Sequence, residues 1–461
     1  MNLYRQIPKV DKIEKKLSHI PKKVLTPIIQ KTLAQIRNDI KNSKISSLSE
    51  EAIIRKIEKE ALDILSPSIK NVINATGITV HTNLGRSLIS EEIFDYAKKR
   101  ATRYCNLEYD LEKGKRGDRY HHSEKLLSAL FGCESALIVN NNASAVFLIL
   151  NTFAKDKEVI VSRGELVEIG GSFRIPEVMK ASSAKLVEVG TTNKTKLKDY
   201  EKAVTENTAM LMKVHKSNYT IEGFSEEASP EEIISLAKKH SLLDYYDLGS
   251  AYIPKLPYSL SNSEPSIDEI MKLNPSLLSF SGDKLFGSAQ AGVILGKKEL
   301  IEKLKQNQIL RMFRVDKITL SLIEATALAY LNEDYDKIPT LKMIFQTTDE
   351  LKQKAEKLLC LTPALKADIK DSFTYVGGGT MPNKKIPTVV VEFEGNAKKW
   401  EEQMRQNLVI GRIENERFVL DLRSVQEDEI EKLAEIVNNI ISCKVQAQHN
   451  IHPTSQLKGQ K

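Results

Sequence analysis

The stretch LLSFSGDKLFG, residues 277–287, decides the fold of this chain. Its apolar part, residues 276–280, predicts a short buried strand that ends at the turn-forming residues Ser281 and Gly282. Lys284 follows directly, at the mouth of that strand. Lysine is almost never fully buried without a partner or a task, and burial penalises its ammonium form. Lys284 is therefore either an ordinary lysine in a strand-to-loop turn or a candidate for a Schiff base with a carbonyl or with pyridoxal phosphate.

Strand and helix patterns alternate along the chain before this stretch. Candidate strands cover residues 136–139, 159–161, 185–189, 210–214, 242–246 and 277–280, and candidate helices cover 124–131, 146–153, 165–181, 198–204 and 231–240. Such alternation predicts an α/β domain with a mostly parallel sheet. Because ligands of these sheets bind at the carboxyl ends of the strands, Lys284 is expected at the ligand-binding edge.

Polar residues stand at three other strand ends. Asp247 follows residues 242–246 and His215 follows residues 210–214, although each alone is more often a cap or a core histidine. The turn Asn141-Asn142-Ala143 joins a strand to an apolar helix. Free N–H groups and the helix dipole make such a turn an anion site, unless the asparagine serves only as a helix cap.

Three of these parts are what a pyridoxal phosphate site requires. Lys284 would form the covalent linkage, Asp247 would keep the pyridine nitrogen protonated, and the turn Asn141-Asn142-Ala143 would bind the phosphate. Their order along the chain resembles the aspartate-aminotransferase-type superfamily. That resemblance implies fold type I: a large domain with a mostly parallel sheet and a small α+β domain.

The first 66 residues predict a separate helical domain. Apolar residues recur at helical spacing over residues 24–36 and 50–64, Ser49 is a plausible cap for the second helix, and Pro67 ends the module. Residues 1–70 carry 15 Lys and Arg against 8 Asp and Glu, which accounts for the whole net charge of +7. A basic module on a neutral body indicates a polyanionic partner such as RNA, with an ordinary solvated surface as the alternative.

The remaining residues divide into three further parts. Residues 67–335 form the predicted catalytic domain, in which 67–120 are linker and active-site loops. Residues 336–445 are expected to form the small α+β domain, with helices over 341–359, 398–405 and 427–437 and strands over 387–393 and 418–422. Residues 446–461 are expected to be a disordered tail. The chain has no apolar run long enough to span a membrane, no secretory signal and four scattered cysteines, which predicts a cytoplasmic protein.

Several long motifs resemble one family closely. They lie at residues 73–77 (INATG), 81–86 (HTNLGR), 106–109 (NLEY), 139–144, 162–171 (SRGELVEIGG), 189–193 (VGTTN) and 280–284 (FSGDK). Together they resemble bacterial selenocysteine synthase, L-seryl-tRNA(Sec) selenium transferase, from the helical module to Arg423. Ser288 departs from the family pattern, in which glycine and proline are expected after Gly287.

The resemblance implies a reaction. Seryl-tRNA(Sec) would displace Lys284 from pyridoxal phosphate, and Lys284 would then remove the α-proton. Loss of the β-hydroxide would give aminoacrylyl-tRNA, to which selenophosphate delivers selenium. The implied catalytic residues are Lys284 and Asp283, of which Asp283 would assist proton transfer. The implied binding residues are Arg86, Arg311 and Arg314 for selenophosphate, Arg119 for the cofactor phosphate, and His215 against the cofactor ring.

The resemblance also implies partners and an assembly. The N-terminal domain would recognise the tRNA, and the chain would form a homodecamer of dimers with active sites at the interfaces. Two other functions remain open from the sequence. One is a pyridoxal-phosphate-dependent lyase acting on a small phosphorylated amino acid or amino sugar, which would not need residues 1–70. The other is a non-catalytic RNA-binding protein, which would not need Lys284 and Asp247.

Overall fold

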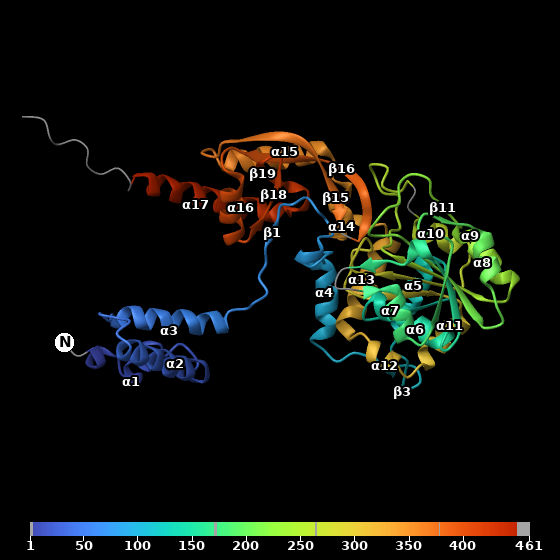
Figure 1. Ribbon diagram of the computed structural model, residues 1–461, viewed down its shortest axis with the longest axis horizontal. Helices are drawn as coiled ribbons and strands as arrows, with labels where there is room; N and C mark the ends of the chain where they lie inside the picture. Colours follow the sequence, from blue (N-terminus) through green and yellow to red (C-terminus); the bar gives the residue numbers. More distant parts are fainter. Residues whose placement is uncertain (1–2, 170–172, 263–264, 378, 450–461) are drawn as a thin grey trace, which may run out of the picture. The chain divides into compact units, whose positions relative to one another are not determined.

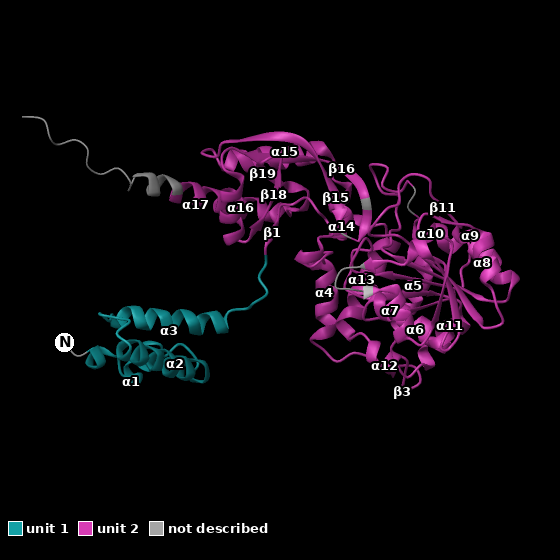
Figure 2. Cartoon of the chain, viewed as in Figure 1, with its two compact units in different colours: residues 1–71 teal, residues 72–461 magenta. Residues whose placement is uncertain are grey.

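The computed structural model describes residues 3–169, 173–262, 265–377 and 379–449. The chain divides into two compact units, residues 1–71 and residues 72–461 (Figure 2). The boundary lies five residues beyond the predicted end of the helical domain at residue 66. This difference is small because residues 66–71, which follow the last helix of unit 1, form an irregular connection.

Unit 1 is helical, as predicted. It contains a short 3₁₀ turn followed by three helices: η1 (Leu3–Gln6), α1 (Val10–Lys16), α2 (Lys22–Lys41) and α3 (Glu50–Leu65). Ser49 accepts a hydrogen bond from the Ala52 N–H at 3.3 Å, which confirms it as the cap of α3. Buried Ile13, Ile29 and Ile57 belong to a core that unit 1 builds from its own residues.

The centre of unit 2 is a seven-stranded sheet. Its order is β4 (Ser135–Val139), β14 (Gly292–Gly296), β13 (Leu277–Ser281), β12 (Leu243–Gly249), β10 (Thr208–Val214), β5 (Glu158–Ser162) and β8 (Lys185–Val189). All neighbours are parallel except β14, which runs antiparallel to both β13 and β4. The predicted α/β class and mostly parallel sheet are therefore confirmed.

Helices cover both faces of this sheet (Figure 1). One face packs against α6 (Asn142–Phe153), α7 (Ile175–Ala181) and α11 (Lys298–Gln306). The other face packs against α5 (His121–Phe131), α9 (Pro230–Lys239) and α13 (Lys317–Leu331), with α8 (Leu197–Ala203) and α10 (Ile267–Lys272) beside them. Further short elements are η2 (Thr82–Leu84), α4 (Glu91–Ala101), β2 (Tyr109–Asp110), β3 (Lys115–Arg116), η3 (Arg163–Glu165), β6 (Glu168–Ile169), β7 (Phe173–Arg174), β9 (Lys194–Thr195), β11 (Glu226–Glu227) and α12 (Leu310–Phe313).

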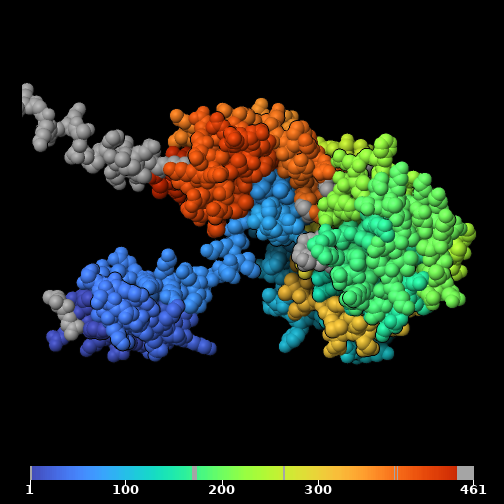
Figure 3. Space-filling view, viewed as in Figure 1, coloured from blue at the N-terminus to red at the C-terminus, as the bar shows by residue number. Residues whose placement is uncertain are grey.

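The C-terminal part of unit 2, called the small domain below, combines a four-stranded antiparallel sheet with helices. The sheet order is β15 (Ala367–Gly377), β16 (Thr380–Phe393), β19 (Arg417–Asp421) and β18 (Arg412–Glu414). The helical elements are η4 (Tyr335–Lys337), α14 (Pro339–Phe345), α15 (Thr348–Leu361), α16 (Ala397–Gln406), η5 (Leu422–Ser424), η6 (Glu427–Glu429) and α17 (Ile430–His449). Strand β1 (Ile73–Asn74) pairs with β17 (Val409–Ile410), so the INATG motif lies against the small domain (Figure 3).

Three expectations for individual elements are wrong. Within the predicted helix 165–181, residues 175–181 form α7, whereas Glu168–Ile169 and Phe173–Arg174 are the strands β6 and β7. Glu165 accepts the backbone N–H of Val214 at 2.9 Å and the Lys213 amine at 2.7 Å, and these bonds hold it against β10. The predicted helix 341–359 is two helices, α14 and α15, because Thr347 caps a new helix by accepting the Glu350 N–H. Helix α17 continues to His449, past the start of the predicted tail at residue 446. Residues 450–461, and Gly170 and Gly171 of the SRGELVEIGG motif, lie outside the described residues.

Within the described part of the chain, no helix combines the length and the apolar character needed to cross a membrane. The four cysteines, Cys105, Cys133, Cys360 and Cys443, are free thiols. The cytoplasmic location stays a prediction.

Candidate active site

Lys284 lies in a tight turn between β13 and β14. The Gly282 N–H donates to the Ala291 carbonyl at 2.8 Å, and the Gly287 N–H donates to the Lys284 carbonyl at 2.9 Å. Gly287 has a φ of +72°, and a Cβ there would lie 2.4 Å from Ile338, so only glycine fits this turn. Lys284 is only 7% exposed. Its burial and the neighbouring Arg86 lower the pKa of its amine, so the neutral, nucleophilic form is more accessible than in an ordinary lysine.

Asp247 is buried at the carboxyl end of β12. Its Oδ1 accepts hydrogen bonds from Asn142 Nδ2 at 2.8 Å and from the Gly249 N–H at 3.1 Å. Burial raises the pKa of Asp247, while Asn142 and the charge of Lys284 act against that rise. A buried carboxylate is stable only with a cationic or hydrogen-bonding partner, so this edge of the sheet is suited to a protonated ring nitrogen.

The predicted phosphate turn is the N-terminus of α6. Asn141 caps the helix by accepting the Ser144 N–H at 2.8 Å, whereas the Asn142 side chain is turned toward Asp247. Ala143 follows in the first turn, where backbone N–H groups are available to an anion. Asn142 thus joins the helix N-terminus to Asp247, a contact that the sequence did not predict. Phosphate binding at this turn stays a prediction.

Arg86 reaches the turn that carries Lys284. Its Nη1 donates to Asp283 Oδ2 at 2.8 Å, and the Ser87 N–H donates to the Asp283 carbonyl at 3.2 Å. Arg86 has a φ of +64° in the turn that starts at His81, and the Arg86 N–H closes this turn on the His81 carbonyl. The Arg86 side chain is 33% exposed, so its guanidinium remains accessible to an anion.

The other predicted arginines do not join Lys284 within one chain. Arg119, Arg311 and Arg314 line a cavity of about 240 Å³ together with Glu108, and Lys284 and Asp247 are not among the lining residues. Glu108 Oε1 lies 2.9 Å from Arg119 Nη2 and 3.7 Å from Arg314 Nη1. Arg119 also donates to the Val315 carbonyl at 3.1 Å. Arg86, which the resemblance assigns to selenophosphate together with Arg311 and Arg314, is not among the residues that line this cavity.

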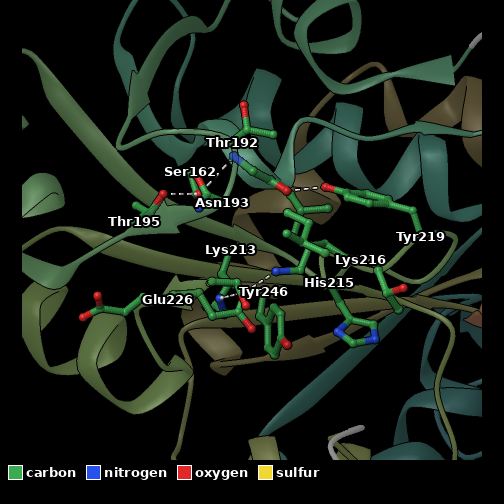
Figure 4. A pocket seen from close by; sticks show the side chains of 16 residues that line it. Ser162, Thr192, Asn193, Thr195, Lys213, His215, Lys216, Tyr219, Glu226 and Tyr246 are labelled. Carbon is green, nitrogen blue, oxygen red and sulfur yellow. Dashed lines mark hydrogen bonds and ion pairs between the residues drawn. The ribbon is translucent and has the colours of Figure 1, made fainter. Parts of the chain in front are cut away.

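His215 connects Asp247 to a neighbouring cavity. Its backbone N–H donates to the Asp247 carbonyl at 2.9 Å, and the residue lines a cavity of about 310 Å³ (Figure 4). Lys213 and Tyr246 line the same cavity and are neighbours in register. Because side chains alternate along a strand, these two lie on the face of the sheet opposite to the Asp247 carboxyl. The cavity is therefore adjacent to the Lys284 site but distinct from it.

The residues present fit pyridoxal phosphate. The site offers a buried amine on Lys284, a buried carboxylate on Asp247 and the open N-terminus of α6. Two further buried oxygens, Asn142 Oδ1 and Asp283 Oδ1, have no hydrogen-bond partner among the described residues. Such atoms are costly unless a ligand or water satisfies them. The donor set is therefore suited to a polar cofactor with an aldehyde, a ring nitrogen and a phosphate.

One residue of the site was missed from the sequence. Gly379, in the loop between β15 and β16 of the small domain, lies against the amine of Lys284. The run of three glycines at residues 377–379 was the available signal, because consecutive glycines often mark a close approach of backbone to another group.

A comparison with solved structures gives the class of fold. A solved structure described as D-glucosaminate-6-phosphate ammonia-lyase matches 82% of this chain and 97% of its own length, with a TM-score of 0.59 and 20% identity. This likeness shows the fold, an α/β protein built on a mostly parallel sheet.

The sequence comparisons then give the family. The family model of L-seryl-tRNA selenium transferase matches residues 72–426. L-seryl-tRNA(Sec) selenium transferase of Nautilia profundicola is 82% identical over 96% of this chain and 99% of its own length. The protein of the same name from Aliarcobacter butzleri is 56% identical over 95% and 99% of the two chains. This chain belongs to the L-seryl-tRNA(Sec) selenium transferase family, which confirms the resemblance seen in the motifs.

Proposed function

We propose that this transferase converts L-seryl-tRNA(Sec) into L-selenocysteinyl-tRNA(Sec), with pyridoxal phosphate on Lys284 and selenophosphate as the selenium donor. Family membership over nearly the whole chain supports the reaction. The observation that carries the chemistry is the buried amine of Lys284 beside the buried carboxylate of Asp247.

The residues of the chain divide the work. Pyridoxal phosphate, when bound, supplies an electron sink for the charge that develops on the α-carbon of the seryl group. Asp247 would hold a proton on the ring nitrogen, and Asn142 keeps the Asp247 carboxylate in place. Lys284, with its lowered pKa, would take the proton from the α-carbon. The N-terminus of α6 would hold the phosphate.

Arg86 and Asp283 would act on the departing β-hydroxide and on the incoming selenophosphate. The accessible guanidinium of Arg86 suits an oxyanion such as selenophosphate. Asp283 fixes that guanidinium through Oδ2, while its Oδ1 has no partner in the described residues and is available to hold a proton. These two side chains therefore supply charge and proton transfer next to Lys284.

The direct test is incubation of the purified protein with seryl-tRNA(Sec) and selenophosphate. Selenocysteinyl-tRNA(Sec), identified after hydrolysis of the ester, is the expected product. Seryl-tRNA that remains unchanged in the presence of cofactor and selenophosphate would contradict the proposed reaction. Replacing the tRNA by free serine or by a phosphorylated amino sugar in the same assay separates this function from a small-molecule lyase.

The variant Asp247→Asn is expected to keep bound cofactor but to lose about 10²-fold or more in turnover, because a neutral amide cannot stabilise a protonated ring nitrogen. Single-turnover rates on seryl-tRNA(Sec) measure this loss. Asn142→Ala should give a smaller loss, since it removes one hydrogen bond to the carboxylate and leaves its charge. Near-normal turnover of Asp247→Asn would place another residue opposite the ring nitrogen.

We infer that Arg119, Arg311 and Arg314 serve the active site of a second subunit in a homo-oligomer, as the family resemblance implies. In one chain they surround Glu108, away from Lys284. Exposed apolar side chains close to these residues in the sequence indicate a surface that another subunit covers. They are Tyr104 (106% exposed), Leu111 (74%) and Met312 (70%). The decamer itself stays a prediction.

Mixed oligomers test this arrangement. Lys284→Ala and Arg311→Ala, each inactive alone, should regain activity when mixed, because roughly a quarter of the sites would then contain neither substitution. The matched control mixes Lys284→Ala with Asp247→Asn, whose residues share one chain's site and cannot complement each other. Equal activity of the two mixtures would mean that the arginines act within their own chain.

A further inference from the structure

The small domain contributes a hairpin tip to the Lys284 site. Gly379, between β15 and β16, has a φ of +76°, and a Cβ built on it would lie 3.6 Å from Lys284 Nζ and 3.9 Å from Cε. A side chain at position 379 would therefore touch the end of the lysine side chain. The left-handed backbone favours glycine here, and an added Cβ would be in van der Waals contact with the lysine amine.

Thr380 fixes this tip to the large domain. Its buried hydroxyl donates to Ser250 Oγ at 3.1 Å, and Ser250 follows the strand β12 that carries Asp247. The next residue, Met381, is buried in the core beside the sheet. Thr380 thus links the backbone above Lys284 to the strand end that carries Asp247.

Contacts on both sides of the hairpin tip also fasten it to the large domain. On one side, the Val80 N–H donates to the Val376 carbonyl at 2.8 Å, next to Gly377. On the other side, Asn383 Nδ2 donates to Thr220 Oγ1 at 2.7 Å. The hairpin is therefore fastened at several points to the large domain instead of projecting freely into solvent.

We propose that Gly379 and Thr380 are positioning residues of the active site: Gly379 covers the Lys284 amine with side-chain-free backbone, and Thr380 holds that cover in register with Asp247. The small domain thereby sets how much room a substrate has above the lysine. The inference rests on the proposed role of Lys284 as the cofactor-bearing residue and adds two residues that this role does not require.

The cover acts on the lysine by excluding water. The charged groups that face Lys284 are Arg86, Asp247 and Asp283, and the hairpin tip adds backbone but no charge. Loosening the tip should admit water to the amine. The pKa of Lys284, which burial and Arg86 lower, should then move upward toward that of an ordinary lysine.

The variants Thr380→Val and Gly379→Ala test the proposal, with Thr380→Ser as the conservative substitution. In cofactor-free protein, the pH dependence of acetylation of Lys284 by acetic anhydride, read by peptide mass spectrometry, should move to higher pH in Thr380→Val and return in Thr380→Ser. Gly379→Ala narrows the space above the amine. It should slow the displacement of Lys284 from the cofactor by seryl-tRNA(Sec) by about 10-fold or more, since small misplacements at reacting groups have effects of this size.

Two controls separate a local effect from a general one. Gly395→Ala introduces the same kind of strained alanine, at a φ of +99°, with its nearest contact at Trp400, and Thr374→Val alters a buried threonine elsewhere in the hairpin. Both should behave as the wild type. Equal effects of Gly379→Ala and Gly395→Ala, or no difference between Thr380→Val and Thr380→Ser, would overturn the proposal. If borohydride fixes the cofactor outside Lys284 in the wild type, the proposed function fails instead.

Discussion

Substitution of Lys284 by alanine is expected to abolish selenocysteinyl-tRNA(Sec) formation and to remove the site at which borohydride fixes pyridoxal phosphate to the chain. The physical reason is that a buried amine with a lowered pKa supplies both the covalent attachment and the base. Peptide mapping after borohydride reduction of the cofactor-loaded protein should find the label on Lys284 alone. The variant should stay folded, since loss of the Lys284 side chain leaves the surrounding apolar core intact.

A matched control for this prediction is Lys354→Ala. Lys354 is also buried and its pKa is also lowered by burial, but it lies on α15 in the small domain and donates to the Val425 carbonyl at 3.0 Å. This variant should keep the label on Lys284 and retain turnover. A reduced peptide that lacks Lys284 in the wild-type protein would show that the cofactor assignment is wrong, whatever the activity of the variants.

Deletion of residues 1–71 is expected to weaken binding of seryl-tRNA(Sec) by about 10³-fold or more while leaving the cofactor in place. All of the net positive charge lies in residues 1–70. Unit 1 and unit 2 each build their own core, so both parts should fold when separated. Filter-binding or anisotropy measurements of the full chain, the truncated chain and the excised unit 1 give the affinities.

Salt dependence distinguishes charge from a purely structural role of unit 1. Binding by the full chain should fall steeply as salt rises, because lysine and arginine contacts with phosphates release counterions. The truncated chain should show a flatter slope. If truncation leaves the affinity and the slope unchanged, tRNA recognition lies on unit 2, and the basic charge of unit 1 is an ordinary solvated surface.

Local patterns predicted most of the elements well. The predicted strand 277–280 lies within β13 and the predicted helix 146–153 lies within α6, because a short buried run and a longer apolar run give clear local signals. The predicted helix 165–181 is wrong at its start, where Glu165 is a buried acid paired with Lys213. The local sequence is compatible with a helix, but contacts with β10, which that local pattern does not reveal, override it.

The sequence by itself determined the α/β class, the separate basic unit, and the placement of Lys284 and Asp247 at strand ends. These depend on periodicity, turn chemistry and composition, which act over a few residues. Only the tertiary structure decided which side chains meet. Asn142 and Asp247, 105 residues apart, share a hydrogen bond, and Gly379 lies close to Lys284 although 95 residues separate them. The physical reason is that such contacts arise from strand order and domain packing, and neither leaves a periodic signal in the chain.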